Sequence, residues 1–309
     1  MKQFLHFLIL FMALTVMSRV INAQEKYAVL ITGDYAAEGI PVEEQWGQGA
    51  DNPLPEFWYD TYLMWEMLVF SEGFSNENVF VLFADGIDYS IVNPNIWSRY
   101  NAQISHNEFF PITDYSATYS HVNDVFTGLA SGTLGFPQVT EDDFLFVWVF
   151  DHGGPMPGQP DPAYFYLLNE VKMFDYEFAE LTSQIISNKK VFWMQQCRSG
   201  GFSDDLEAPN TVFHSACQAL EYSRPADNVD LYGGQVDEWD FYYSNPLESN
   251  RHGEFNFHVY SATVGESPAY EDNYNGQLYS EADENNDHFI SVLESYNWED
   301  THESIDEYL

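Results

Sequence analysis

Two apolar segments of the chain each end in residues that can carry out nucleophilic chemistry. The first segment, residues 143–150, is followed by Asp-His-Gly-Gly, which contains His152 and Gly153. The second, residues 191–194, is followed by two glutamines, Cys197 and a Gly/Ser turn. A buried strand that runs into a Gly-rich turn exposes the residues at its carboxyl end. If the two segments are parallel strands of one sheet, they place an imidazole beside a thiol, as a cysteine nucleophile and its base require.

The segments around these motifs alternate between strand-like and helix-like patterns. The expected strands cover residues 26–32, 79–83, 143–150, 191–194 and 211–217, and the expected helices cover residues 57–72, 121–131 and 174–186. Strand–helix–strand connections with right-handed crossovers predict an α/β fold with a doubly wound, mostly parallel sheet and helices on both faces. Ligands of such sheets bind beyond the carboxyl ends of the strands, which is where His152 and Cys197 fall.

The beginning of the chain is typical of an exported protein. Met1 and Lys2 give a positive start, residues 4–16 are almost wholly apolar, and residues 21–23 offer a small-residue cleavage site. We therefore expect residues 1–23 to be a signal peptide and the mature protein to be secreted or periplasmic. An uncleaved anchor is the alternative, although the apolar run is short for a membrane span.

The net charge of the chain limits its partners. The sequence holds 49 acidic residues against 10 basic ones, which gives a formal net charge of −39. A protein this acidic repels nucleic acids and anionic membranes, so we expect no nucleic-acid partner and no membrane partner after removal of the signal peptide. The acidic residues are scattered along the chain, as on a solvated surface.

The chain has two cysteines, Cys197 and Cys217. In an exported protein two cysteines suggest a disulfide, which would make Cys197 unreactive. Against this alternative, Cys217 falls in the expected strand over residues 211–217, where a lone buried cysteine behaves as a small hydrophobic residue.

The motifs DHGG and QQCRSGG on consecutive apolar strands resemble those of the caspase-like (clan CD) cysteine peptidases, most closely the legumain-like C13 family. The resemblance implies a caspase-like peptidase domain over residues 24–309, a polypeptide substrate and no organic cofactor. It implies Cys197 as nucleophile, His152 as general acid and base, and an oxyanion site formed by the backbone N–H groups of Gly153 and Cys197. The chemistry agrees, because an imidazolium favours the thiolate and a glycine allows close approach of its N–H.

The substrate pocket is expected to differ from that of legumain-like enzymes. These enzymes carry an Arg-His pair before the first helix and a Glu two residues before the nucleophile, where this chain has Glu56-Phe57 and Gln195. Tyr222 and Ser223 fall where the family lines its pocket. We therefore expect Glu56, Gln195, Tyr222 and Ser223 to contact substrate. The acidic lip predicts that a basic or neutral polar P1 side chain is preferred over an acidic one.

Two charged neighbours of the motifs receive no catalytic role. Asp151 precedes His152 in the expected strand, so the two side chains should point to opposite faces of the sheet. Arg198 directly follows the nucleophile and is expected to be an exposed charge. No third catalytic residue is assigned.

Residues 283–294 have the spacing of an EF-hand-like calcium loop. Oxygen donors stand at loop positions 1, 3, 5, 7, 9 and 12, namely Asp283, Asn285, Asp287, the carbonyl of Phe289, Ser291 and Glu294. Position 6, usually Gly, is His288, a residue type that is among those better tolerated at positive φ. An exiting helix is expected over residues 292–298, whereas no entering helix is indicated. We expect structural calcium here, and an acidic surface turn is the alternative.

The predicted function is that of an exported cysteine endopeptidase, which hydrolyses peptide bonds through a Cys197 thioester. One alternative keeps the same site but transfers the acyl group to an amine, as a transpeptidase or ligase does. Another is a catalytically inactive, calcium-stabilised binding module.

Overall fold

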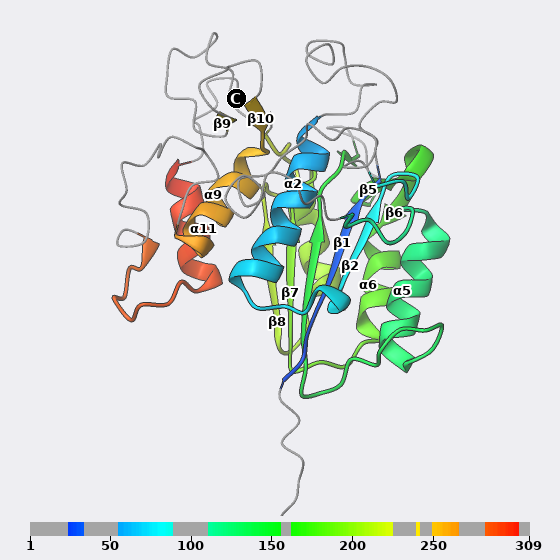
Figure 1. Ribbon diagram of the computed structural model, residues 1–309. Helices are drawn as coiled ribbons and strands as arrows, with labels where there is room; N and C mark the ends of the chain where they lie inside the picture. Colours follow the sequence, from blue (N-terminus) through cyan, green and yellow to red (C-terminus); the bar gives the residue numbers. More distant parts are fainter. Residues whose placement is uncertain are drawn as a thin grey trace, which may run out of the picture.

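The computed structural model of the chain describes residues 24–33, 55–88, 111–155, 162–224, 239–241, 249–265 and 282–302. At its centre lies a five-stranded parallel sheet with the strand order β2-β1-β3-β7-β8 (Figure 1). The strands are β1 (Lys26–Thr32), β2 (Val79–Phe83), β3 (Phe144–Val149), β7 (Lys189–Met194) and β8 (Thr211–Ser215).

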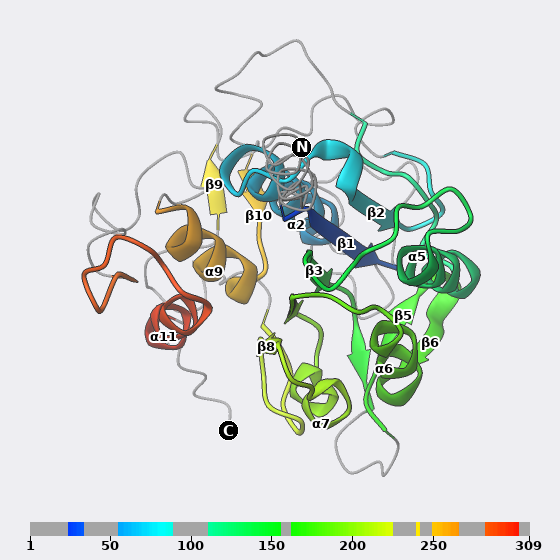
Figure 2. The ribbon, with the colours of Figure 1, turned by 90° about the horizontal axis from the view of Figure 1, so that it is seen from below.

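Helices cover both faces of this sheet (Figures 1 and 2). One face carries α2 (Pro55–Glu66) and α9 (Glu254–Val264), with α11 (Val292–His302) packed against α9. The other face carries α5 (Tyr119–Ser131), α6 (Asp175–Ser183) and the short α7 (Ser203–Leu206). The predicted α/β fold with a doubly wound parallel sheet is thereby confirmed.

The hydrophobic core has two halves, because successive side chains of a strand point to opposite faces. In β3, Phe146 and Trp148 pack under α2 and α9, whereas Leu145, Val147 and Val149 pack under α5 and α6. All five of these side chains are buried. A sheet covered on both faces needs apolar residues at every position, which explains the continuous apolar runs in the sequence.

The helix ends differ slightly from the predicted ones. After α2, the chain continues through a single π-helical stretch, Met67–Ser71, and turns at Gly73, whose φ is 69°. α5 begins two residues before its predicted start, because the Thr118 hydroxyl accepts a hydrogen bond from the His121 N–H and so caps the helix. Gly132 ends α5 in a left-handed conformation.

Several elements were not expected from the sequence. A small antiparallel sheet joins β4 (Gly153–Gly154), β5 (Tyr164–Leu167) and β6 (Val171–Phe174). A second antiparallel pair joins β9 (Trp239–Phe241) and β10 (Ser249–Arg251). Short 3₁₀ turns occupy Asn76–Asn78, Leu168–Glu170 and Ser199–Phe202.

The predicted signal peptide, residues 1–23, lies outside the described residues. Within the described ranges, the structure contains no helix that combines the length and the apolar character needed to span a membrane.

Candidate active site

The register between β3 and β7 brings His152 and Cys197 to the same edge of the sheet. Val149 pairs with Met194 across these neighbouring parallel strands, and His152 and Cys197 are each the third residue after that pair. Gly153 confirms how closely the two turns approach, because a Cβ at this position would collide with the backbone carbonyl oxygen of Cys197. The two motifs therefore meet at the carboxyl ends of the strands, at the upper edge of the sheet in Figure 1.

The backbone of His152 is held by its neighbours on both sides. Its N–H donates to the carboxylate of Asp151, which also accepts the N–H of Gly33 at the end of β1. Its carbonyl accepts the N–H of Tyr166 at 3.0 Å. The half-buried ring packs edge-on against Phe57 of α2, with ring centroids 5.2 Å apart. Asp151 is buried and lies beyond the end of β3, so the strand geometry that we expected for this pair does not apply.

The Cys197 thiol lies beside Ser223. Its Sγ is 3.7 Å from the Ser223 Oγ and 4.0 Å from the Ser223 carbonyl oxygen. Burial raises the pKa of the Cys197 thiol, while the contacts with Ser223 and the charge of Arg198 act in the opposite direction. Since burial is the largest of these effects, the resting thiol is neutral at pH 7 and needs a base to become a nucleophile.

The sequence profile of the Peptidase C13 family matches residues 59–230, more than half of the chain, and this range contains both motifs. The chain belongs to the peptidase C13 family. It is similar to vacuolar-processing enzyme beta-isozyme 1 of Oryza sativa, in both subspecies indica and japonica, with 25% identity over 162 residues. That match covers 49% of this chain and 32% of each relative. The matched part therefore spans about a third of the curated relatives' length.

The predicted pocket residues of this C13 chain occupy different environments. Ser223 touches the thiol, whereas Tyr222, its neighbour, is 45% exposed. Glu56 lies in the first turn of α2, and its side chain is outside the described part of the structure. Their contact with substrate stays a prediction.

Gln195 is fully buried and joins two parts of the C13 site. Its Oε1 accepts the N–H of Asn256 in α9 at 3.1 Å, and its Nε2 donates to the carbonyl of Arg224 at 3.3 Å. Arg224 directly follows Ser223, so Gln195 helps to place the residue that contacts the thiol. Both of these hydrogen bonds of the Gln195 side chain go to the backbone of the protein. The predicted contact of Gln195 with substrate stays a prediction.

A buried polar cluster lies behind Gln195, and no pattern in the sequence predicts it. Asp60 of α2 accepts hydrogen bonds from His252 Nδ1 at 2.6 Å, the Gly253 N–H at 2.9 Å and Asn256 Nδ2 at 2.7 Å. Burial raises the pKa of the Asp60 carboxyl, and the bond from His252 is the largest effect that lowers it. Because the partners stand about 190 residues apart, only the folded chain brings them together.

Arg198 is buried, which corrects the expectation of an exposed charge. Only 5% of its surface is accessible, its φ is 65°, and its N–H donates to the carbonyl of Glu221 at 2.9 Å. The guanidinium Nε is buried and finds no hydrogen-bond partner among the described residues. The loop that contains Glu221 thus lies against the turn that follows Cys197, and the Gly200 N–H adds a second bond between them, to the Cys217 carbonyl at 2.9 Å.

The cysteines are both free, so the disulfide alternative is not supported. Cys217 lies beyond the end of β8 rather than in the strand, and it is half-buried. Its Sγ is 3.4 Å from the Ser199 Oγ and 3.7 Å from the Gln196 carbonyl oxygen. Burial raises the pKa of the Cys217 thiol as well.

The predicted calcium loop is folded around its two end carboxylates. Asp283 accepts the N–H groups of Asp287 and His288, at 3.1 and 2.9 Å. Glu294 accepts the N–H and the hydroxyl of Ser291, at 2.8 and 2.7 Å, and the N–H of Asn285 at 3.3 Å. His288 has a φ of 68°, the conformation that position 6 of such a loop requires.

The donor set of the loop contains carboxylates, an amide, a hydroxyl and a carbonyl, which is the oxygen chemistry that calcium prefers. Phe289, whose carbonyl is the expected ligand at position 7, is exposed. Across the described ranges, however, no group of three or more His, Cys, Asp or Glu residues is arranged to hold a metal ion. Calcium binding therefore stays a prediction.

Proposed function

We propose that this C13 chain is a cysteine endopeptidase with Cys197 as nucleophile and His152 as general acid and base. The observation that carries the proposal is the contact between the two strand-end turns, in which Gly153 lies directly against the Cys197 carbonyl. Membership of the C13 family supports the same chemistry.

The reaction begins with transfer of the thiol proton to His152, because burial keeps the Cys197 thiol neutral at rest. The thiolate attacks the carbonyl carbon of the scissile bond, and the N–H groups of Gly153 and Cys197 stabilise the oxyanion. His152 then returns the proton to the leaving amine, and a thioester remains on Cys197. A water molecule, deprotonated by His152, attacks the thioester and releases the acid.

We further propose that the protein acts on polypeptides outside the cytoplasm, after removal of residues 1–23. Its pocket takes a basic or neutral polar P1 side chain, since Glu56 and Gln195 stand where legumain-like enzymes carry Arg and Glu. Calcium bound at residues 283–294 stabilises the fold rather than taking part in the reaction.

A peptide-library digest tests the proposed dyad directly. The mature chain should cleave internal peptide bonds, and Cys197→Ala and His152→Ala should each remove nearly all hydrolysis. Cys217→Ala is the matched control, since it removes a neighbouring free thiol and should retain most of the activity. Loss of activity in a folded Cys217→Ala protein, with activity kept in Cys197→Ala, would show that the nucleophile is misassigned.

The same digest distinguishes the acceptor and the preferred side chain. Addition of an amine nucleophile reveals a transpeptidase through the mass of the joined product. Cleavage confined to bonds after Asn or Asp would contradict the proposed P1 preference. A thiol-directed peptide electrophile that fails to label Cys197 in the folded protein would favour an inactive binding module.

A further inference from the structure

The small antiparallel sheet of β4, β5 and β6 continues the edge that carries His152. Its first strand, Gly153–Gly154, directly follows His152, and the His152 carbonyl accepts the N–H of Tyr166 in β5 at 3.0 Å. A Cβ on Gly33, after β1, would collide with the backbone of Leu167, so the end of β1 also lies against β5. Figure 1 accordingly shows β5 and β6 beside the upper ends of the central strands. The small sheet is therefore a lateral extension of the candidate active site.

The two faces of the small sheet have different surroundings. Phe165, Leu167 and Met173 form its inner face and are buried in the half of the core under α5 and α6. Successive residues of a strand point to opposite faces, and directly paired residues of neighbouring strands point to the same face. The cross-strand pair of Tyr166 and Lys172 therefore lies on the outer face, which is turned away from α5 and α6.

The catalytic histidine lies on the same side as this outer face. The antiparallel register of β4 and β5, continued by one residue, sets His152 opposite Tyr166. The His152 ring packs edge-on against Phe57, which belongs to the other half of the core, under α2 and α9. His152, Tyr166 and Lys172 thus form one row across three neighbouring segments of chain, with their side chains on one side of the small sheet.

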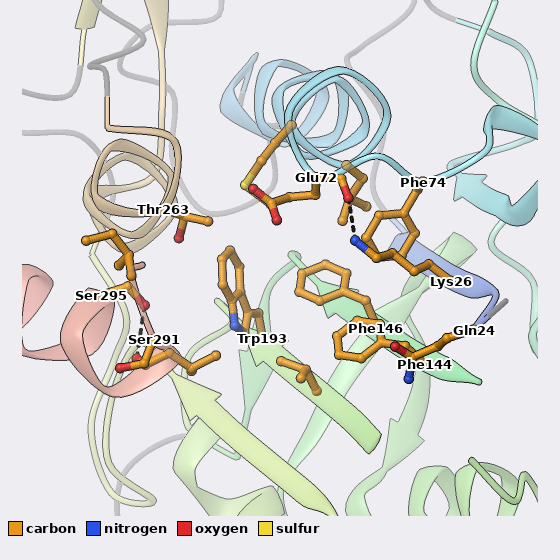
Figure 3. Close-up of a pocket in the computed structure, with 15 residues that line it drawn as sticks. Gln24, Lys26, Glu72, Phe74, Phe144, Phe146, Trp193, Thr263, Ser291 and Ser295 are labelled. Carbon is orange, nitrogen blue, oxygen red and sulfur yellow. Dashed lines mark hydrogen bonds between the residues drawn. The ribbon is translucent and has the colours of Figure 1, made fainter. Parts of the chain in front are cut away.

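Lys172 places an exposed positive charge on the outer face. Its ammonium lies over the Tyr164 ring, 4.0 Å from the ring centroid, and this contact holds the long side chain in place. The ammonium makes neither an ion pair nor a hydrogen bond with any residue that the structure describes. By contrast, the Lys26 ammonium, beside the cavity drawn in Figure 3, donates to the Glu72 carbonyl at 2.6 Å. Lys172 is therefore available to a carboxylate from another molecule.

The chemistry of peptide hydrolysis decides which part of a substrate reaches this face, and this step rests on the function proposed above. In the order β3-β7-β8, the turn that carries Cys197 lies between the His152 turn and the loop after β8. Ser223, in that loop, contacts the Cys197 thiol. His152, on the other side, has to protonate the leaving amine. The residues that follow the scissile bond therefore leave past His152, toward Tyr166.

We propose that the outer face of the small sheet binds the residues that follow the scissile bond, and that Lys172 selects an acidic side chain among the first three of them. Neighbouring strands lie about 4.8 Å apart, so the backbone of Lys172 lies roughly 10 Å from that of His152. An extended peptide covers this distance in about three residues. Tyr166, which is partly exposed between them, provides an aromatic contact surface for the peptide.

The charge of the whole protein makes this preference a specific one. A chain with a net charge of −39 repels acidic peptides at long range, so a preference for an acidic residue requires a cation close to the bound peptide. The preference concerns residues after the scissile bond, and it is separate from the basic or neutral polar P1 side chain before that bond.

Positional isomers of one peptide test the proposal at equal charge. The sequence that the peptide-library digest shows to be cleaved best is followed by six residues, one Glu and five Gln. Glu at the first, second or third position is compared with Glu at the sixth. We expect kcat/KM to be about threefold higher for the best of the near isomers, as the strength of an exposed ion pair implies. The gain should come from KM at unchanged kcat, because the pair forms in the bound substrate and in the transition state alike.

Charge variants assign the preference to one residue. Lys172→Met should make the near and sixth-position isomers equal, and Lys172→Glu should reverse their order. Lys172→Arg keeps the charge and should keep the preference. Lys189→Met is the matched control, because it removes the same charge from an exposed lysine at the amino end of β7, and it should keep the threefold difference.

The outcomes separate this proposal from the proposed peptidase activity. Equal kcat/KM for all isomers in an active parent would overturn the role of Lys172 and leave the peptidase assignment standing. A preference that persists in Lys172→Met, or one that is lost in Lys189→Met, would also overturn it. A parent that cleaves no peptide would overturn both proposals, because a surface for the leaving residues requires a cleavage reaction.

Discussion

Acidification should destabilise this protein through His214, a histidine near the carboxyl end of β8. The side chain is 3% exposed and surrounded by the rings of Trp193, Phe255 and Tyr296, with centroid distances of 5.9, 4.6 and 5.3 Å. Neither ring nitrogen has a hydrogen-bond partner among the described residues. Burial lowers the pKa of His214 from 6.5 to about 3, so the folded protein keeps this ring neutral.

The size of the effect follows from proton linkage. In the unfolded chain the histidine takes up a proton below about pH 6.5, whereas in the folded chain it does so only near pH 3. The unfolded state therefore binds more protons between these values, and stability falls as the pH falls through this window. One proton corresponds to about 1.4 kcal/mol per pH unit, so His214 alone should remove ~2 kcal/mol of unfolding free energy between pH 7 and pH 5.

Urea unfolding at pH 7 and pH 5 measures this directly in the parent, His214→Phe and His214→Asn. Other titrating groups are shared, so they cancel when the pH-dependent loss of each variant is subtracted from that of the parent. Both variants should lose ~2 kcal/mol less than the parent, even though the buried amide of the Asn variant costs stability at every pH. The reasoning would be refuted if both variants lost as much stability as the parent on acidification.

Three further changes test the edge of the sheet and the C-terminal loop. Gly153→Ala places a methyl group against the Cys197 carbonyl, so peptide hydrolysis should fall about 100-fold or more, and full activity would contradict the close approach. Arg198→Met removes a positive charge that lowers the pKa of the Cys197 thiol, so the pH profile of thiol alkylation should move to higher pH; an unchanged profile would mean that the charge lies too far away. In thermal melts across calcium concentrations, Glu294→Gln should reduce the calcium-dependent shift more than Ser291→Ala, and equal shifts in parent and Glu294→Gln would place the ion elsewhere.

The central sheet could be predicted from the sequence because its physical signal is local. Strands buried on both faces need continuous apolar runs, and Lys26–Thr32 and Val79–Phe83 were predicted with the bounds that the structure has. The order of strands and helices then placed His152 and Cys197 at one edge, since parallel strands present their carboxyl ends together.

The rest depends on contacts between distant segments. α9 gives no helical period, because its polar residues Glu254, Asn256, His258 and Ser261 are buried like its apolar ones. The partners of Asp60 come from the same remote segment. A charged side chain beside a Gly/Ser turn is usually exposed, but Arg198 is buried, and its N–H bonds to a loop about 20 residues away.

The pairing of β3 with β7 brings His152 and Cys197, the two residues that we propose react, to the same edge of the sheet. The same six residue pairs also order the core. Slippage by one residue would exchange the side chains of β7 between the two halves of the core, where Trp193 and Phe192 are each packed among different neighbours, so close packing opposes it. A relative that folds but is inactive is therefore expected to differ in the turns beyond the strands, either in a side chain or in the length of a loop. Conversely, a designer could place another pair of reactive side chains side by side by changing only the two turns. The sheet, which sets the distance between these turns, would stay unchanged.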